Sequence, residues 1–143
     1  MVVIVAGSRS IVDGQSVLEA VERYSKQNTI ARLVCGCAPG PDRLACEWAW
    51  QNGVPIDFFP AWDWQELWGL GVCVPDRGDV LVPSSYNRGR GNGRLRNAAM
   101  ALRADAALLI WDGTSSGTQD MARRMEQAKK PFVIIKQGEE IMK

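Results

Sequence analysis

Five short apolar runs, rich in β-branched and aliphatic residues, recur along the chain without polar alternation. Continuous runs of this length are typical of strands in a parallel sheet that is covered on both faces. The pattern therefore predicts the strands of an α/β fold. These predicted strands are residues 2–6, 31–35, 55–59, 106–111 and 131–135.

Between the runs, apolar residues recur at the spacing of amphipathic helices. Asp13 offers an N-cap for the first helix, and Asn52-Gly53 is a typical helix end for the second. Because strands and helices alternate, we expect a parallel sheet with right-handed crossovers. The apolar helical positions are Val17, Leu18, Val21 and Tyr24; Leu44, Ala45, Trp48 and Ala49; Leu95, Ala98, Ala99 and Leu102; and Met121, Met125 and Ala128.

The predicted fold is a single Rossmann-like three-layer α/β/α domain with a five-stranded parallel sheet in the order 3-2-1-4-5. The domain covers residues 1–136 and carries a long loop insertion at about 61–93. Residues 137–143 form a polar tail, which we expect to fray. In this strand order the switch point lies between the first and fourth strands, where ligands of open α/β sheets bind.

The composition agrees with one globular domain and narrows the classes of function. The chain has 143 residues, of which 46% are hydrophobic and 23% charged, and its formal net charge is +1. That charge provides no bulk attraction to nucleic acid or to a membrane. No stretch reaches the length of a membrane span, and the apolar start is too short for a signal peptide. We therefore expect a cytoplasmic protein without membrane contacts.

The chain has no histidine, so a general acid or base would have to be Asp, Glu, Lys, Tyr or Cys. Histidine-based triads are excluded. The four cysteines form no Cys-x-x-Cys pair, and their spacing is poor for zinc. We therefore expect free thiols, no metal site and no cofactor. The cysteines are Cys35, Cys37, Cys46 and Cys73.

Three glycine-bearing turns follow the first, second and fourth predicted strands, at residues 7–10, 36–42 and 113–118. These strands are neighbours in the predicted order, so the turns meet at one edge of the sheet. Glycine lets backbone N–H groups approach an anion, and the helix that follows adds its positive end. One such turn is common in α/β proteins, but three that converge at a switch point indicate a phosphate site. The candidate ligand-binding residues in these turns are Gly7, Ser8, Arg9, Gly36, Gly40, Asp42, Gly113, Ser115, Ser116, Gly117 and Thr118.

Two charged residues in these turns allow more than one interpretation. Arg9 follows the first strand, where its guanidinium could clamp a phosphate or simply face solvent. Asp42 opens a helix, where a carboxylate repels phosphate but accepts hydrogen bonds from ribose hydroxyls or caps its own helix. No Gly-x-Gly-x-x-Gly sequence is present, so the fingerprint of dinucleotide cofactors is not supported.

Residues 84–103 contain five arginines and no acidic residue. This stretch is either a solvated basic loop, a lid over a polyanionic ligand, or a local contact to nucleic acid. Three tryptophans precede it and could pack on the third strand or stack on a base. The arginines are Arg88, Arg90, Arg94, Arg96 and Arg103, and the tryptophans are Trp62, Trp64 and Trp68.

Taken together, these motifs resemble the SLOG superfamily, the Rossmann-like group that includes the DNA-processing protein A fold and the lonely-guy phosphoribohydrolases. Within it, they are most similar to the stand-alone proteins related to YspA and YpsA. The matching motifs are in the right order and span nearly the whole chain. They are Gly7-Ser8-Arg9, Gly36 through Gly40 with Asp42-Arg43-Leu44-Ala45, Phe59-Pro60-Ala61, Arg96-Asn97-Ala98-Ala99-Met100 and Gly117-Thr118-Gln119-Asp120-Met121.

The resemblance implies a nucleotide or nucleotide-derived ligand, with Arg96 and Asn97 added to its site, and a homodimer. It also implies N-glycosidic cleavage, because the lonely-guy enzymes use an arginine and a glutamate for that reaction. Arg96 matches the arginine, but Met121 stands where the glutamate is expected. The catalytic candidates are therefore Arg96 with Asp120, one residue earlier on the helix, or with Asp42.

Three functions follow as alternatives. The first is a sensor or sequestering module for a nucleotide-type small molecule, favoured because the glutamate is missing. The second is a phosphoribohydrolase-like enzyme that cleaves the N-glycosidic bond of a nucleoside 5′-monophosphate through an oxocarbenium-like transition state. The third is single-stranded nucleic-acid binding, against which the net charge of +1 argues.

Overall fold

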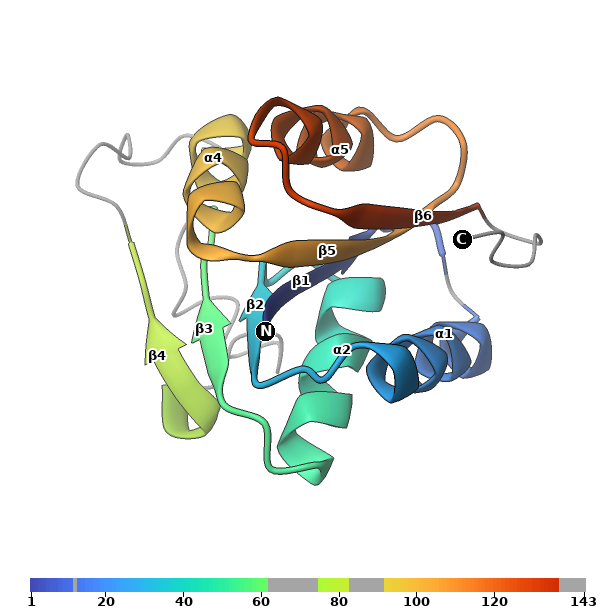
Figure 1. The fold of residues 1–143 in the computed structure, drawn as a ribbon, viewed down its shortest axis with the longest axis vertical. Helices are drawn as coiled ribbons and strands as arrows, with labels where there is room; N and C mark the ends of the chain where they lie inside the picture. Colours follow the sequence, from blue (N-terminus) through green and yellow to red (C-terminus); the bar gives the residue numbers. More distant parts are fainter. Residues whose placement is uncertain (12, 62–74, 83–91, 137–143) are drawn as a thin grey trace.

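The computed structural model describes residues 1–11, 13–61, 75–82 and 92–136 as one parallel sheet between two layers of helices (Figure 1). Parallel strands fill the middle layer in the order β4-β3-β2-β1-β5-β6. The strands are β1 (Val2–Gly7), β2 (Arg32–Cys35), β3 (Ile56–Phe58), β4 (Gly78–Val80), β5 (Ala106–Trp111) and β6 (Phe132–Lys136). The helices are α1 (Gly14–Gln27), α2 (Pro41–Gln51), α4 (Gly93–Arg103) and α5 (Ser116–Gln127), with a 3-10 turn at Pro75–Arg77.

Each face of the sheet has its own hydrophobic core, because successive strand residues point to opposite sides. On one side, Val3 and Val5 of β1 pack with α1 and α2. On the other, Ile4 packs with α4 and α5, as the two helix layers in Figure 1 show. Met121 and Met125 belong to this second core, at 2% and 0% exposure, so they are core rather than interface residues.

The predicted class and strand order are confirmed, but the number of strands is wrong. The described residues form six strands rather than five. The additional strand, β4, lies inside the predicted loop insertion and pairs with β3 at the sheet edge. It was missed because it has three residues and no apolar run. Gly78 is needed there, since a Cβ at this position would lie 2.0 Å from the Ile56 carbonyl oxygen.

A buried ion pair ties the second helix layer to the sheet. Asp57 of β3 is 2% exposed. Its carboxylate accepts hydrogen bonds from Arg32 Nη1 at 2.8 Å and from Arg103 Nε at 2.9 Å. A buried carboxylate needs such partners, because desolvation would otherwise be costly. One of the five arginines of the basic stretch, Arg103, is therefore part of the scaffold.

Several predicted features lie wholly or partly outside the described residues. These are residues 62–74 and 83–91 of the loop insertion, the three tryptophans, Arg88, Arg90, Cys73 and the tail at 137–143. The other three cysteines, Cys35, Cys37 and Cys46, are buried. Among the residues that the structure describes, no helix is long and apolar enough to cross a membrane.

Candidate functional site

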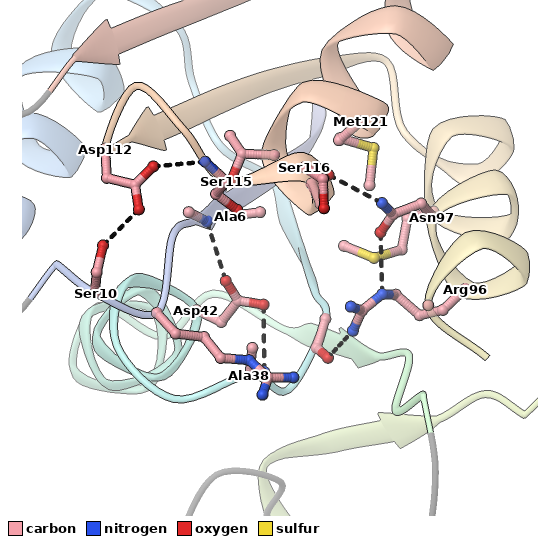
Figure 2. Close-up of a pocket in the computed structure, with 17 residues that line it drawn as sticks. Ala6, Ser10, Ala38, Asp42, Arg96, Asn97, Asp112, Ser115, Ser116 and Met121 are labelled. Atoms are coloured by element: carbon pink, nitrogen blue, oxygen red, sulfur yellow. Dashed lines mark hydrogen bonds between the residues drawn. The ribbon is translucent and has the colours of Figure 1, made fainter. Parts of the chain in front are cut away.

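A cavity of about 460 Å³ opens at the carboxyl edge of the sheet, beside the switch point between β1 and β5 (Figure 2). Residues of all three predicted turns line it, together with one side of α4 from Gly93 to Met100. The volume is in the range of small-molecule sites, which is roughly 300–1,000 Å³. The convergence of the three turns, predicted from the strand order, is therefore present in the structure.

The turn after β1 is pressed against β5. A Cβ on Gly7 would lie 2.5 Å from the Ile110 carbonyl oxygen, so only glycine fits here without a shift. Ser8 is 1% exposed and does not line the cavity. Its hydroxyl lies 3.3 Å from the Thr118 hydroxyl and accepts a hydrogen bond from the Asp112 N–H at 3.1 Å. Ser8 therefore joins the first turn to the third instead of offering a free donor.

Asp42 joins the first turn to the second. It lies in the first turn of α2 and is 3% exposed. Its two carboxylate oxygens accept hydrogen bonds from the N–H groups of Gly7 at 3.2 Å and Ala38 at 3.3 Å. Burial raises the pKa of Asp42 to about 7, although the Arg96 charge and the two backbone N–H groups oppose this rise. The carboxyl group thus changes protonation near neutral pH.

Arg96, in the first turn of α4, is held in place by two hydrogen bonds. Its Nε donates to Asn97 Oδ1 at 3.0 Å, and its Nη1 donates to the Gly36 carbonyl oxygen. Among the described residues, Nη2 has no hydrogen-bond partner, and Figure 2 shows the guanidinium directed into the cavity. Gly36 makes room for this arrangement, because a Cβ there would lie 2.8 Å from both Arg96 Nη1 and Asp42 Oδ2.

The third turn places the start of α5 at the cavity. Asp112 follows β5 and accepts hydrogen bonds from Ser10 Oγ at 2.6 Å, Thr114 N at 2.8 Å and Ser115 N at 2.7 Å. These bonds, led by that of Ser10, hold the pKa of Asp112 well below its usual range. The first-turn N–H groups of α5 have no carbonyl partner within the helix. They belong to Ser116, Gly117 and Thr118, which line the cavity.

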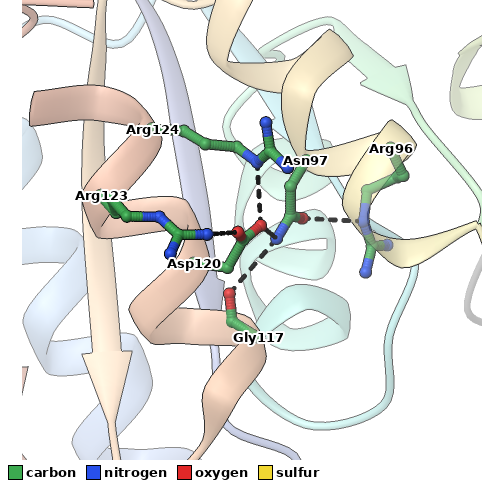
Figure 3. Close-up of polar contacts among 6 residues, drawn as sticks. All are labelled: Arg96, Asn97, Gly117, Asp120, Arg123 and Arg124. Atoms are coloured by element: carbon green, nitrogen blue, oxygen red, sulfur yellow. Dashed lines mark hydrogen bonds and ion pairs between the residues drawn. The ribbon is translucent and has the colours of Figure 1, made fainter. Parts of the chain in front are cut away.

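Asp120 does not line this cavity, and its carboxylate lies among Arg123, Arg124 and Asn97 (Figure 3). Its carboxylate pairs with Arg123 Nη2 at 2.7 Å and Arg124 Nε at 2.9 Å, and it accepts a hydrogen bond from Asn97 Nδ2 at 3.0 Å. Burial opposes its ionisation, but the hydrogen bonds from Arg124 and Asn97 outweigh this effect and lower its pKa. Asp120 is therefore placed to hold arginines rather than to reach a ligand in the first cavity.

Most of the predicted site residues come together, and a few serve the scaffold. Ser8, Gly40 and Gly113 do not line the first cavity, and Asp120 lines a second one described below. The predicted residues that do line the first cavity are Gly7, Arg9, Gly36, Asp42, Arg96, Asn97, Ser115, Ser116, Gly117 and Thr118.

Sequence reasoning missed some of the lining. Asp112 could have been found, because an aspartate between a strand and a helix is a typical turn residue. Ala6, Met100 and Met121 also line the cavity; the two methionines belong to the matching motifs but were not among the candidate site residues. Ser10 and Ala38 also line the cavity. Within the described part of the chain, no group of three or more cysteine, aspartate or glutamate residues is placed to hold a metal ion.

Comparisons with known proteins agree with this fold. A family model described as "YspA, cpYpsA-related SLOG family" matches residues 1–66, which confirms the predicted resemblance over that range. DNA processing protein A from Streptococcus pneumoniae is 21% identical to this chain, with a TM-score of 0.68. The match covers 92% of this chain and 49% of the Streptococcus pneumoniae chain. DNA processing protein A from Helicobacter pylori, whose structure is described in terms of its single-stranded DNA binding mode, is 18% identical, with a TM-score of 0.67. The match covers 98% of this chain and 68% of the Helicobacter pylori chain. At these identities the likeness shows the fold alone.

The chain thus spans about half the length of the first of these structures. The search of curated proteins finds no match.

Proposed function

We propose that this chain, whose residues 1–66 match the SLOG family of YspA and cpYpsA relatives, binds a nucleotide-type ligand in the first cavity as a sensor or sequestering module. One observation carries the proposal. Two groups on different helices lie at the same cavity. They are Nη2 of Arg96, which has no hydrogen-bond partner among the described residues, and the first turn of α5. A guanidinium and a helix N-terminus are both suited to phosphate oxygens.

The rest of the cavity suits the other parts of a nucleotide. Met100 and Met121 close the cavity on its apolar side, although they are only 1% and 2% exposed, so a base can contact no more than their edges. Asp42 has lone pairs left beside its two N–H partners and can accept ribose hydroxyls. Arg9 lines the same cavity and adds a second cation for the phosphate.

The test compares nucleoside 5′-monophosphates with their nucleosides. Calorimetric titration of the wild-type protein with AMP, GMP, CMP and UMP should show at least one binder whose Kd is more than about tenfold below that of its nucleoside. Arg96→Gln should weaken that binder by about 10- to 100-fold, as expected for hydrogen bonds to a charged group. Arg23→Gln is the matched control, because Arg23 is exposed on α1. If no monophosphate binds up to millimolar concentration, the proposal is wrong.

N-glycosidic hydrolysis is a second candidate, favoured by one specific observation. Asp42 is a buried carboxyl group with a pKa of about 7, and it lines the cavity with Arg96. A group that titrates near neutral pH suits general acid–base catalysis. Incubation with each monophosphate and chromatography for free base tests this candidate. Hydrolysis that persists in Asp42→Asn would exclude Asp42 from the reaction.

Single-stranded nucleic acid is the third candidate, because the Helicobacter pylori neighbour is described as binding single-stranded DNA. A gel shift with an oligodeoxynucleotide tests it. A shift that is lost on going from 50 to 200 mM salt would indicate only non-specific attraction to phosphates.

A further inference from the structure

A second cavity, of about 620 Å³, adjoins the first between the starts of α4 and α5. The two cavities share lining residues on both helices, namely Gly93, Arg96, Asn97, Ser116 and Gly117. They are therefore neighbouring parts of one site, and Arg96 lies at their boundary. A ligand that fills the first cavity can extend past Arg96 into the second.

The charge of the second cavity is positive. Arg94, Arg96 and Arg123 line it, and Asp120 is the carboxylate among the lining residues. Arg124, which is not part of the lining, already pairs with Asp120 at 2.9 Å (Figure 3). Because Arg124 lies outside the lining and pairs with Asp120, it balances the negative charge of Asp120. The three lining arginines therefore leave the second cavity with a net positive charge.

These arginines are accessible to a ligand. The side chain of Arg123 is 60% exposed even though its Nη2 donates to Asp120 Oδ1 at 2.7 Å. That bond fixes the guanidinium in one orientation at the cavity wall. Arg94 is exposed in the first turn of α4. Guanidinium groups bind phosphates through paired N–H donors, so a second phosphate is the chemistry that this surface fits.

We propose that the ligand is a linear, phosphodiester-linked dinucleotide, with one nucleotide in each cavity and the linking phosphate beside Arg96. This inference rests on the proposed function, since it places the first nucleotide as described above. Each cavity has the volume of a small-molecule site, so a mononucleotide leaves the basic one empty. The ligand differs from dinucleotide cofactors, whose glycine fingerprint is absent.

Calorimetric titration with the 5′-phosphorylated dinucleotides of ApA and GpG, against AMP and GMP, tests the inference. A dinucleotide should bind more than about tenfold more tightly than its mononucleotide. Arg94→Gln and Arg123→Gln should each remove most of this gain while leaving the Kd of the mononucleotide within about twofold. Arg23→Gln on α1 should change neither affinity. Thermal melting of each variant checks that the fold is intact.

The outcomes separate this inference from the proposed function. If mononucleotides bind but the dinucleotides bind no more tightly, the inference is wrong and the proposed function stands. The inference is also wrong, and the proposed function stands, if the gain in affinity survives both arginine substitutions. If neither mononucleotides nor dinucleotides bind, both proposals are wrong.

Discussion

The protonation of Asp42 makes stability depend on pH in a direction opposite to that of most aspartates. Its carboxyl group is buried between two turns, and its pKa of about 7 lies well above the ordinary value of 3.8. Between these two values the folded protein binds a proton that the unfolded chain releases. Stability is therefore highest below about pH 4 for this group and falls as the pH rises through 7.

The magnitude follows from the shift. About three pH units, at about 1.36 kcal/mol each, give roughly 4 kcal/mol that Asp42 removes from stability between pH 4 and pH 8. Asp112 and Asp120, whose pKa values are lowered, act in the opposite direction, so the total curve mixes these effects. Comparison with Asp42→Asn removes the titration of Asp42, because asparagine does not titrate, together with its coupling to the charge of Cys35, which helps to raise the Asp42 pKa.

The assay is urea unfolding of the wild-type protein and Asp42→Asn at half-unit steps from pH 4 to pH 8. At low pH the wild type should be the more stable, by about 1–3 kcal/mol, because the asparagine amide leaves one of the N–H groups of Gly7 and Ala38 unsatisfied. This advantage should shrink, and then reverse, as the pH rises. Two parallel stability curves would refute the reasoning and mean that Asp42 is ionised throughout.

Three further substitutions test the geometry. Gly7→Ala should lower the free energy of unfolding by about 1–3 kcal/mol, because the new Cβ would lie 2.5 Å from a β5 carbonyl oxygen. The control is Gly117→Ala, whose Cβ meets nothing within 4 Å and should not destabilise the protein. Equal urea midpoints for the two variants would contradict this expectation. Asp57→Ala should lower the free energy of unfolding in urea by about 2 kcal/mol, because its two half-exposed arginine partners lose their buried acceptor. An unchanged urea midpoint would show that these ion pairs do not stabilise the fold. Asp120→Asn should leave the mononucleotide Kd within about twofold by calorimetry, because this side chain lies outside the first cavity; a loss of more than about tenfold would place it in the site.

Much of the fold could be predicted because its two central strands, β1 and β5, have six residues each and are mostly buried. The run from Ala106 to Trp111 has no polar residue, and such a segment fits the middle of a parallel sheet. Strand β4 could not be predicted in the same way. Its residues, Gly78–Val80, carry no pattern, and its pairing depends on the space that Gly78 leaves beside β3.

The site was predicted at the level of its turns, but not at the level of each side chain. A short hydroxyl side chain in a turn can face either a ligand or the protein, and only the backbone path decides this, so Ser8 proved to be internal. The role of Asp120 was visible in the sequence, since arginines three and four residues later are its neighbours on a helix. The buried pair of Asp57 joins residues 25 and 46 positions apart, and nothing local marks it.

The most direct test of the central claim is the map of backbone amide shifts in a ¹⁵N–¹H NMR titration with the tightest-binding nucleoside 5′-monophosphate. The N–H groups of Ser116, Gly117 and Thr118 should shift most, together with the Arg96 side-chain signal. The matching nucleoside, which lacks the phosphate, should leave these signals nearly unchanged. Shifts confined to α1 and α2, or equal shifts with the nucleoside and the nucleotide, would contradict a phosphate site at the start of α5.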